Sequence, residues 1–429
     1  MAFRRWFFGL VGVGGVAVLA CLALAWQPAI PPIVPPSPDS FAPELVSKGR
    51  TLAVAAGCID CHTVKNGMPG TGGVSFARMF GTIYSSNITP DAETGIGRWS
   101  LVAFARALRE GVSRDGKHLF PAAFPFDHFT RLTDEDIAAL YAYLMSLPPA
   151  RKRTRPNSVP FPLDIRALQA AWKGIYLVPG AYRQDVTRDA QWNRGAYLAD
   201  AVARCSSCHT PRNVLGAEEP GHPYGGTLVD GWWATALDIE PSPASWSAAQ
   251  LVEYLRTGES VPHGVALEPM RGVVRALRVL PDSDLATIAA YLTSFLSYAP
   301  DRQAAAARAV APREPQNDEE RYGLQRYLAV CGGCHEKPGA TPEAARSPIG
   351  LSADIWMDEP DNIVRIVLDG VTRNDLPPGP AMPGFREQLD DADIAVIVEY
   401  LRKSHTTLPA WGEIEARVAL VRARSARTR

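Results

Sequence analysis

The sequence predicts a mainly α-helical protein made of three similar helical modules behind an apolar N-terminal segment. Three observations predict this class. The pentapeptide Cys-x-x-Cys-His occurs three times, a helix of similar sequence follows each copy, and 429 residues are enough for about three domains. The composition, with 46% hydrophobic and 21% charged residues, is that of an ordinary globular protein.

The three pentapeptides have the spacing of covalent c-type haem attachment. Two thiols at this spacing can each form a thioether to one porphyrin edge, and the imidazole of the adjacent histidine then reaches the iron. The sequence therefore predicts three covalently bound haem c groups. The motifs are Cys58-Ile-Asp-Cys61-His62, Cys205-Ser-Ser-Cys208-His209 and Cys331-Gly-Gly-Cys334-His335.

Paired cysteines also occur in zinc sites and in thiol redox proteins. A structural zinc ion needs four ligands, and no second Cys-x-x-Cys pair stands beside any of the three motifs. Thioredoxin-like chemistry needs a surrounding βαβ pattern, which this sequence lacks. Both interpretations are therefore weaker than haem attachment.

Each module is predicted to end in a helix that begins near an aspartate and contains a Tyr-Leu pair. These helices cover residues 136–144, 284–292 and 393–401. The first two modules also share a middle helix, at residues 100–111 and 247–258, with Ser as N-cap and Gly as the stop. The tyrosines and leucines lie at helical spacing and are interpreted as core residues.

The N-terminus combines Arg4 and Arg5 with an uncharged apolar run over residues 6–26. Such a run is long enough to span a bilayer, and the arginines before it place the rest of the chain across the membrane. We expect a transmembrane anchor in the bacterial inner membrane, with the haem modules facing the periplasm. A cleavable signal peptide is the alternative, because Ala23-Leu-Ala25 resembles a cleavage site.

Domain boundaries are expected where proline and charge accumulate without periodicity. The predicted parts are an anchor and Pro-rich stalk (1–43), module one (44–150), a linker (151–185), module two (186–299), a linker (300–316), module three (317–408) and a polar, basic tail (409–429).

The residue opposite each histidine controls whether a haem iron transfers electrons or binds an outside ligand. In module three, Met382 lies in the proline-rich loop Pro380-Ala-Met-Pro383 and is the predicted sixth ligand. In module two, Met270 occupies the equivalent place, and His263 is the nearest rival. A thioether in this position raises the reduction potential.

Module one breaks this pattern, because Ala123 or Phe124 stands where methionine is expected. His128 on the same loop is the leading candidate for the sixth ligand, since imidazole is a good haem ligand. The alternative interpretation is a surface histidine or an open haem. The other candidates are Met79, His118 and Met145, the last of which is better explained as core.

The net charge is −1, from 44 basic and 45 acidic residues. This balance gives no reason to expect nucleic-acid binding, so any partner must dock on local patches.

Beyond the haem motifs, longer segments resemble one family: the triple-haem cytochrome c subunits of bacterial membrane-bound dehydrogenases, which serve alcohol, aldehyde, gluconate, nicotinate or isoquinoline dehydrogenases. The resemblance covers nearly the whole chain. The segments that carry it are residues 80–91, 94–99, 205–213 and 381–383.

This resemblance implies three tandem cytochrome c-like domains that take electrons from a catalytic subunit and deliver them to ubiquinone or a terminal acceptor. The chain itself would carry no substrate chemistry. Alcohol dehydrogenase relatives usually have Pro-Ala-Met-Pro where this chain has Pro121-Ala-Ala-Phe-Pro125. The departure favours the relatives that are paired with molybdenum-containing aldehyde, nicotinate or isoquinoline dehydrogenases over those paired with a quinoprotein or flavoprotein.

Two other functional hypotheses are kept. A multihaem peroxidase would need an open first haem with acid–base residues beside it, and His118 or His128 could serve there. A soluble shuttle cytochrome would require cleavage of the N-terminal segment.

Overall fold

The computed structural model describes residues 25–78, 81–120, 123–238, 242–261, 263–296, 312–336, 348–373 and 381–426. The chain forms two compact units. The first comprises Met1–Thr187 with Asp200–Arg204, and the second comprises Arg188–Ala199 with Cys205–Arg429. The first unit contains the first predicted haem motif, and the second unit contains the other two.

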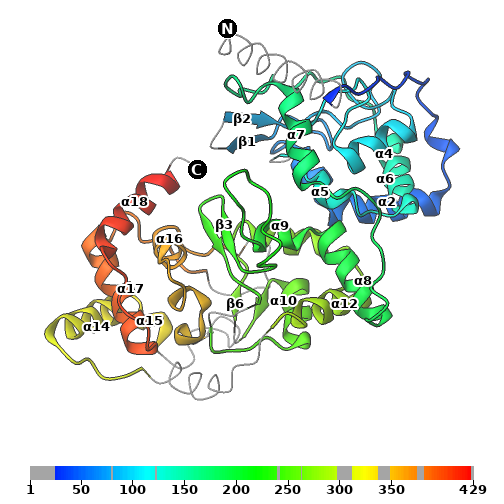
Figure 1. Cartoon of the computed structure of the whole chain (residues 1–429). Coiled ribbons are helices and arrows are strands. Elements are labelled where there is room, and N and C mark those ends of the chain that lie inside the picture. Colours follow the sequence, from blue (N-terminus) through cyan, green and yellow to red (C-terminus); the bar gives the residue numbers. More distant parts are fainter. Residues whose placement is uncertain are drawn as a thin grey trace, which may run out of the picture. The chain divides into compact units, whose positions relative to one another are not determined.

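The first unit is mainly helical, with one small antiparallel hairpin (Figure 1). Its elements are η1 (Pro38–Ser40), α2 (Pro43–Ala55), α3 (Cys58–Cys61), β1 (Ser75–Arg78), β2 (Gly81–Tyr84), α4 (Leu101–Glu110), α5 (Phe126–Phe129), α6 (Asp134–Ser146) and α7 (Arg166–Tyr176). The hairpin pairs Ser75 with Tyr84 and Arg78 with Gly81.

The second unit is also mainly helical, so the prediction of a mainly α-helical protein is confirmed for the described residues. Module two contains α8 (Ala190–Ala196), η2 (Tyr197–Val202), α9 (Cys205–His209), β3 (Thr227–Val229), β4 (Trp232–Ala234), α10 (Ala248–Thr257), β5 (Glu259–Ser260), β6 (Gly264–Val265), α11 (Met270–Leu277) and α12 (Asp282–Thr293). Module three contains α14 (Asp318–Val330), α15 (Gly332–His335), η4 (Ile349–Leu351), η5 (Ala353–Ile355), α16 (Asp361–Asp369), α17 (Asp391–His405) and α18 (Ile414–Ala426).

The ends of the middle helices follow from local sequence, as predicted. The Ser100 hydroxyl accepts a hydrogen bond from the Ala103 amide at the start of α4, and Gly111 ends that helix at φ +58°. In α10, Ser247 forms a capping box with Gln250, and Gly258 ends the helix at φ +86°. These positive φ values are ones that glycine adopts without a steric penalty.

In each module the helix before the haem motif packs against the later helix that carries the Tyr-Leu pair: α2 against α6, α8 against α12, and α14 against α17 (Figure 1). A glycine at each crossing lets the two helices approach closely. A Cβ atom would lie 1.9 Å from the Ala139 carbonyl oxygen at Gly49, 2.0 Å from the Thr287 carbonyl oxygen at Gly195, and 2.8 Å from the Tyr400 Cβ at Gly323. The three modules therefore share one helix crossing.

The repeated tyrosines lie at these same crossings. The Cβ atoms of Tyr143 and Tyr291 lie 2.8 and 2.7 Å from the position that a Cβ atom would take on the facing glycine. Tyr291 and Tyr400 are buried, with exposed fractions of 5% and 6%. The interpretation of the tyrosines as helix-packing residues is confirmed.

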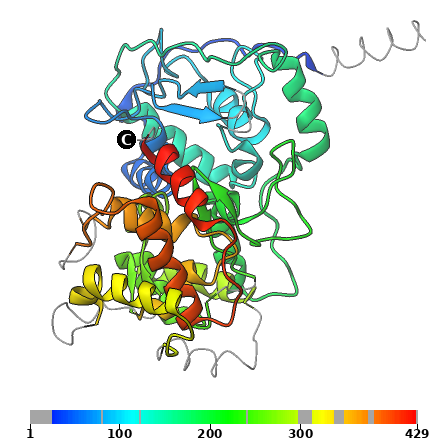
Figure 2. The same cartoon turned by 90° about the vertical axis from the view of Figure 1, so that its left-hand side faces the viewer.

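Two segments differ from expectation. The predicted linker at residues 151–185 contains the helix α7, and the predicted polar tail at residues 409–429 contains the helix α18. Residues 414–426 of the predicted basic tail are helical (Figure 2), and Val418 and Val421 are buried against α16 and α17. Few apolar residues were enough to order this helix, since they share one face.

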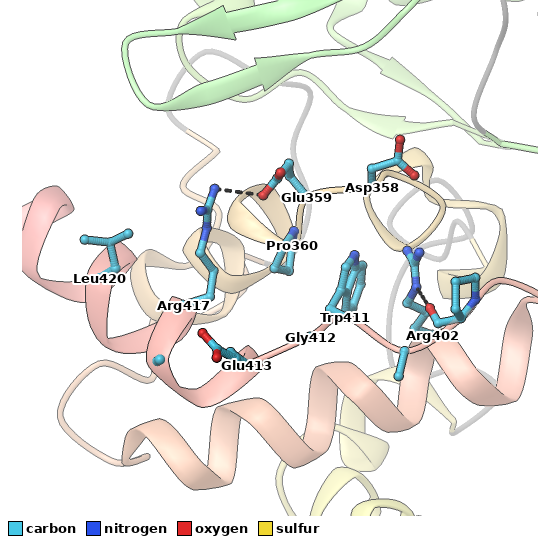
Figure 3. Close-up of a pocket in the computed structure, with 12 residues that line it drawn as sticks. Asp358, Glu359, Pro360, Arg402, Trp411, Gly412, Glu413, Arg417 and Leu420 are labelled. Atoms are coloured by element: carbon cyan, nitrogen blue, oxygen red, sulfur yellow. Dashed lines mark hydrogen bonds and ion pairs between the residues drawn. The ribbon is translucent and has the colours of Figure 1, made fainter.

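Ion pairs and a tryptophan fix the start of α18. Trp411 is 7% exposed, and the Arg402 guanidinium lies 4.2 Å from the centre of its ring. Arg417 pairs with Glu359 at 2.8 Å and with Asp361 at 2.7 Å. Figure 3 shows Arg417 directed at Glu359, and both residues line a cavity of about 500 Å³ together with Arg402 and Trp411.

Among the residues that the structure describes, no helix is long and apolar enough to cross a membrane. The predicted anchor over residues 6–26 lies outside the described part, except for its last two residues.

Candidate haem sites

The first haem motif forms the short helix α3, and Gly57 before it adopts φ +67° and turns the chain out of α2. Nδ1 of His62 donates a hydrogen bond of 2.6 Å to the carbonyl oxygen of Ser86. A carbonyl can only accept, so Nδ1 carries the proton and Nε2 keeps the lone pair that iron requires. Burial lowers the pKa of His62, although the bond to Ser86 opposes that shift.

The second motif has the same arrangement. Nδ1 of His209 donates to the carbonyl oxygen of Thr235 at 2.8 Å, and burial lowers the pKa of the imidazole. The residue before the motif again has positive φ, but it is Arg204, at +60°. A metal-binding histidine usually has its second nitrogen held in this way, which fixes the ring and its tautomer.

The backbone of each of these histidines is also tied down. The carbonyl oxygen of His62 accepts from the Gly72 amide, and that of His209 accepts from the Gly226 amide, both at 2.7 Å. Gly72 and Gly226 have φ values of +69° and +78°. Each of these histidines is thus held by two hydrogen bonds, one at the ring Nδ1 and one at its own carbonyl oxygen.

The third motif spans α15, which begins directly after Cys331. Burial lowers the pKa of His335, and the residue after it, Glu336, accepts a hydrogen bond of 2.7 Å from the Tyr327 hydroxyl. Tyr327 belongs to α14, so the motif is anchored to the first helix of its own module. Residues 337–347 lie outside the described part.

Among the described residues, the surroundings of the motif cysteines do not resemble a zinc site. Burial raises the pKa of Cys58 to about 12 and that of Cys331 to about 11, so these two thiols are neutral at pH 7. Within the described ranges, no third Cys, His, Asp or Glu side chain joins these cysteines closely enough to complete a zinc site.

Met382, the predicted sixth ligand of module three, is held by a backbone bridge. Its amide and carbonyl pair with those of Val371, at 3.2 and 2.9 Å. Gly370 precedes this bridge at φ +71°, and a Cβ atom there would lie only 2.4 Å from the Met382 carbonyl oxygen. Close backbone packing therefore fixes the position of the Met382 backbone, from which its side chain extends.

Met270, the predicted ligand of module two, is the first residue of α11 and is half-buried. Its rival His263 stacks on Trp246, with ring centres 3.5 Å apart and planes 10° from parallel. Burial lowers the pKa of His263 to about 4, so the ring is neutral at pH 7. Both candidates for the sixth ligand, Met270 and His263, therefore lie in module two.

Module two also contains buried polar atoms that lack partners. The Nε1 of Trp233, the Oγ of Ser260 and the Nε2 of His263 are buried and have no hydrogen-bond partner among the described residues. Buried polar atoms are normally satisfied, so three in one module are consistent with a further polar or metal-bearing group there. The motif residues of this module, two thiols and the His209 imidazole held through Nδ1, are the groups that fit a haem c.

His128, the candidate in module one, lies in α5 and is only 3% exposed, so it is not a surface histidine. Its Nδ1 donates to the carbonyl oxygen of Asp200 at 2.9 Å, within the first unit. This is the same backbone anchoring that His62 and His209 have. Phe124, which stands near the expected methionine position, packs 5.8 Å from Phe129, measured between ring centres.

The other candidates of module one are placed differently. Nε2 of His118 is bonded to the carbonyl oxygen of Ala25 at 2.6 Å, and the ring is 3% exposed. Met145 is 1% exposed in α6, as expected of a core residue. Met79 lies outside the described residues.

Sequence reasoning missed the residues that hold the histidines. Ser86 and Thr235 act through backbone carbonyls, which leave no side-chain signature. Sequence reasoning also missed the crossing glycines, although Gly49, Gly195 and Gly323 each stand eight to ten residues before the first cysteine of a haem motif.

Two protein-family models match the chain. The model described as cytochrome c matches residues 46–148, and the model described as cytochrome c oxidase, cbb3-type, subunit III matches residues 318–401. These matches cover the modules that contain the first and third motifs. Cytochrome c domains imply covalently bound haem c.

Curated relatives extend the likeness to most of the chain. A nicotinate dehydrogenase subunit of Pseudomonas putida is 43% identical over 98% of this chain, which spans only 35% of that protein's length. The fructose dehydrogenase cytochrome subunit of Gluconobacter japonicus is 35% identical over 85% of this chain and 80% of its own length. The gluconate 2-dehydrogenase cytochrome c subunit of Pantoea cypripedii is 34% identical over 85% of this chain and 87% of its own length.

The last two relatives are matched over more than two thirds of their lengths, and each is a cytochrome subunit of a dehydrogenase. Their likeness covers more than the haem motifs alone. The chain therefore belongs to the family of cytochrome c subunits of dehydrogenase complexes.

Proposed function

We propose that this chain is an electron-transfer subunit that carries three covalent haem c groups and passes electrons from a catalytic dehydrogenase subunit to an acceptor. One observation carries the proposal above all others. His62 and His209 are each held through Nδ1 by a backbone carbonyl, which leaves Nε2 as the iron ligand.

Each bound haem would supply an iron that gains and loses one electron. The residues that hold the groups are Cys58, Cys61, Cys205, Cys208, Cys331 and Cys334 as thioether donors, and His62, His209 and His335 as axial ligands. Met270, Met382 and His128 are the proposed opposite ligands. Methionine raises the reduction potential, so the haem opposite His128 would have the lowest potential of the three.

For the partner, we favour a molybdenum-containing dehydrogenase over a quinoprotein or flavoprotein. The absence of methionine from Pro121-Ala-Ala-Phe-Pro125 supports this choice. So does the 43% identity to the nicotinate dehydrogenase subunit of Pseudomonas putida, which exceeds the identity to the fructose and gluconate dehydrogenase subunits. Co-purification with a quinoprotein and no molybdenum subunit would contradict it.

We further propose that the chain is anchored in the bacterial inner membrane by residues 6–26, with the modules in the periplasm. The charge-free run behind Arg4 and Arg5 supports this placement. The acceptor would then be membrane ubiquinone or a terminal acceptor protein. Release of the haem protein without detergent would instead support a cleaved, soluble shuttle.

The test is haem stoichiometry on protein produced with a working c-type maturation system. We expect three haems per chain by pyridine haemochrome, and two after Cys58→Ala/Cys61→Ala, Cys205→Ala/Cys208→Ala or Cys331→Ala/Cys334→Ala. Bound zinc in place of haem would overturn the proposal. Reduction of all three haems by the dehydrogenase and its substrate would then establish the direction of transfer.

A further inference from the structure

The second and third modules share an interface within the second unit. The side chain of Asn362 in α16 makes two hydrogen bonds of 2.9 Å to the backbone of Trp233 in β4. Ser242 donates to the Leu351 carbonyl oxygen at 2.6 Å. These contacts align two modules that stand far apart in the sequence.

A second part of this interface joins the two loops that carry the methionines. Arg271 directly follows Met270, is 7% exposed, and donates from Nη1 to the Thr372 hydroxyl at 2.9 Å. Its Nε donates to the Ala266 carbonyl oxygen at 3.2 Å. Arg271 therefore connects its own loop in module two to a residue of module three.

On the other side, Thr372 continues the strand bridge that positions Met382. It directly follows Val371, whose amide and carbonyl pair with those of Met382. The Arg271–Thr372 hydrogen bond therefore links the two methionine loops. Arg271 directly follows Met270, and Thr372 directly follows the backbone partner of Met382.

A buried ion pair also joins the two modules, and its module-three member, Arg373, directly follows Thr372. Glu259 in β5 pairs with Arg373, and the two side chains are only 8% and 10% exposed. Removing one member of such a pair would leave a buried charge uncompensated, so the pair strongly favours this one arrangement of the two loops.

We propose that these four residues, Glu259, Arg271, Thr372 and Arg373, form a methionine junction that positions Met270 and Met382 together. The junction couples the second and third haems, so a change on one side alters the potential of the other. This inference rests on the proposed function, since it takes Met270 and Met382 as the axial ligands.

Charge gives the coupling a direction. The two acceptors of Arg271 described above are neutral oxygen atoms, so these bonds do not cancel its positive charge. A buried cation beside an axial ligand disfavours the more positive, oxidised iron. Arg271 therefore raises the reduction potential of the second haem, and Thr372 holds it in the position where it does so.

The decisive variant is Thr372→Val, which keeps the side-chain shape and removes the acceptor on the module-three side. We expect a drop in the potential of the second haem, up to a tenfold change in its reduction equilibrium, which is about 59 mV for one electron. The matched control is Thr406→Val, a buried threonine outside the junction. A Thr372→Val shift confined to the third haem, or equal to that of the control, would overturn the proposal.

Arg271 supplies a second, independent measurement. Arg271→Gln removes the charge and is expected to lower the second potential more than Thr372→Val does. Arg271→Lys keeps the positive charge but lacks the planar guanidinium, and its second haem is expected to have a potential between those of Arg271→Gln and the wild type. Equal potentials in the two Arg271 variants would contradict a role for the charge.

The spectrum separates failure of the junction from failure of the ligand assignment. Loss of one methionine-to-iron charge-transfer band in Met270→Ala, and of another in Met382→Ala, supports the ligands. If these bands are lost but Thr372→Val leaves the second haem unchanged, only the junction is wrong. If Met270→Ala keeps its band, the assignment of Met270 is wrong and the junction fails with it.

Discussion

Gly49 in α2 packs against the backbone of Ala139 in α6 so closely that a Cβ atom on the glycine would lie 1.9 Å from the Ala139 carbonyl oxygen. No side chain fits this crossing unless the two helices move apart. Because α3 and the first haem motif follow α2 directly, the crossing also determines where His62 stands relative to the last helix of its module.

We therefore expect Gly49→Ala to lower the free energy of unfolding of the haem-loaded protein by about 1–3 kcal/mol, the usual cost of overpacking. Urea denaturation followed by far-UV circular dichroism would measure it. Gly174→Ala in α7 is the matched control, because nothing lies within 4 Å of its Cβ position. That change should stabilise the helix by about 0.5–1 kcal/mol. Similar effects of the two substitutions would contradict the close crossing.

Trp411 is expected to hold α18 against α16 and α17. The Trp411→Ala variant loses a 7%-exposed ring, the Arg402 contact at 4.2 Å and a 3.1 Å hydrogen bond to the Met357 carbonyl oxygen. Such a truncation costs about 3–5 kcal/mol. Limited proteolysis should then cut near residues 409–426 first. Leu420→Ala, which lies on the same cavity wall but is 38% exposed, should leave the cleavage rate nearly unchanged.

The stability of module three should depend on acid through Glu320. Hydrogen bonds from Arg313, at 2.7 and 2.9 Å, lower the pKa of Glu320 from its ordinary 4.5 to about 2. Because the folded pKa is the lower one, the carboxylate stabilises the fold above pH 4.5, and this stabilisation is lost as the pH falls through about 2.

The Glu320→Gln variant tests this linkage. It should be less stable than the wild type at neutral pH, and the difference should shrink as the pH falls through about 2, where half of the wild-type carboxyl is protonated. Thermal unfolding across that pH range measures the difference. Glu319→Gln, at a neighbouring carboxylate that is 69% exposed, serves as the control. A pH-independent difference for Glu320→Gln would rule out the carboxylate as its cause.

Local sequence predicted those parts of the fold whose causes are themselves local. The Ser100 and Ser247 caps and the Gly111 and Gly258 stops each act within one helix, so their signals survive in the sequence. The haem motif is similarly self-contained, because its thiols and imidazole lie within five residues.

The remaining features depend on contacts between distant residues. Arg271 and Thr372 are 101 positions apart, and Glu259 and Arg373 are 114 apart, so no periodicity reports either contact. The sequence predicted only a polar tail where α18 stands, because this segment has few apolar residues. Its order comes from the packing of Val418 and Val421 against α16 and α17 and from the ion pairs of Arg417. Tertiary contacts decide such segments.

The buried, hydrogen-bonded His128 has two possible roles: it can be an axial ligand of the first haem iron, or it can only stabilise the fold through Asp200. Its ring donates to the Asp200 carbonyl oxygen from Nδ1, and a ligand would use Nε2. Substitutions at His128 can separate the roles of its two ring nitrogens. Asparagine places an amide donor near the position of Nδ1 but offers nothing at Nε2, whereas alanine removes both.

If His128 is the sixth ligand of the first haem, His128→Asn and His128→Ala should behave alike. Both should convert that haem from low-spin to high-spin, allow cyanide to bind, and change the lowest of the three potentials, since an axial ligand is lost in each. Absorption spectra and potentiometric titration measure these effects. If the histidine only holds Asp200, the asparagine variant should resemble the wild type, and an unchanged lowest potential in the alanine variant would exclude it as the ligand.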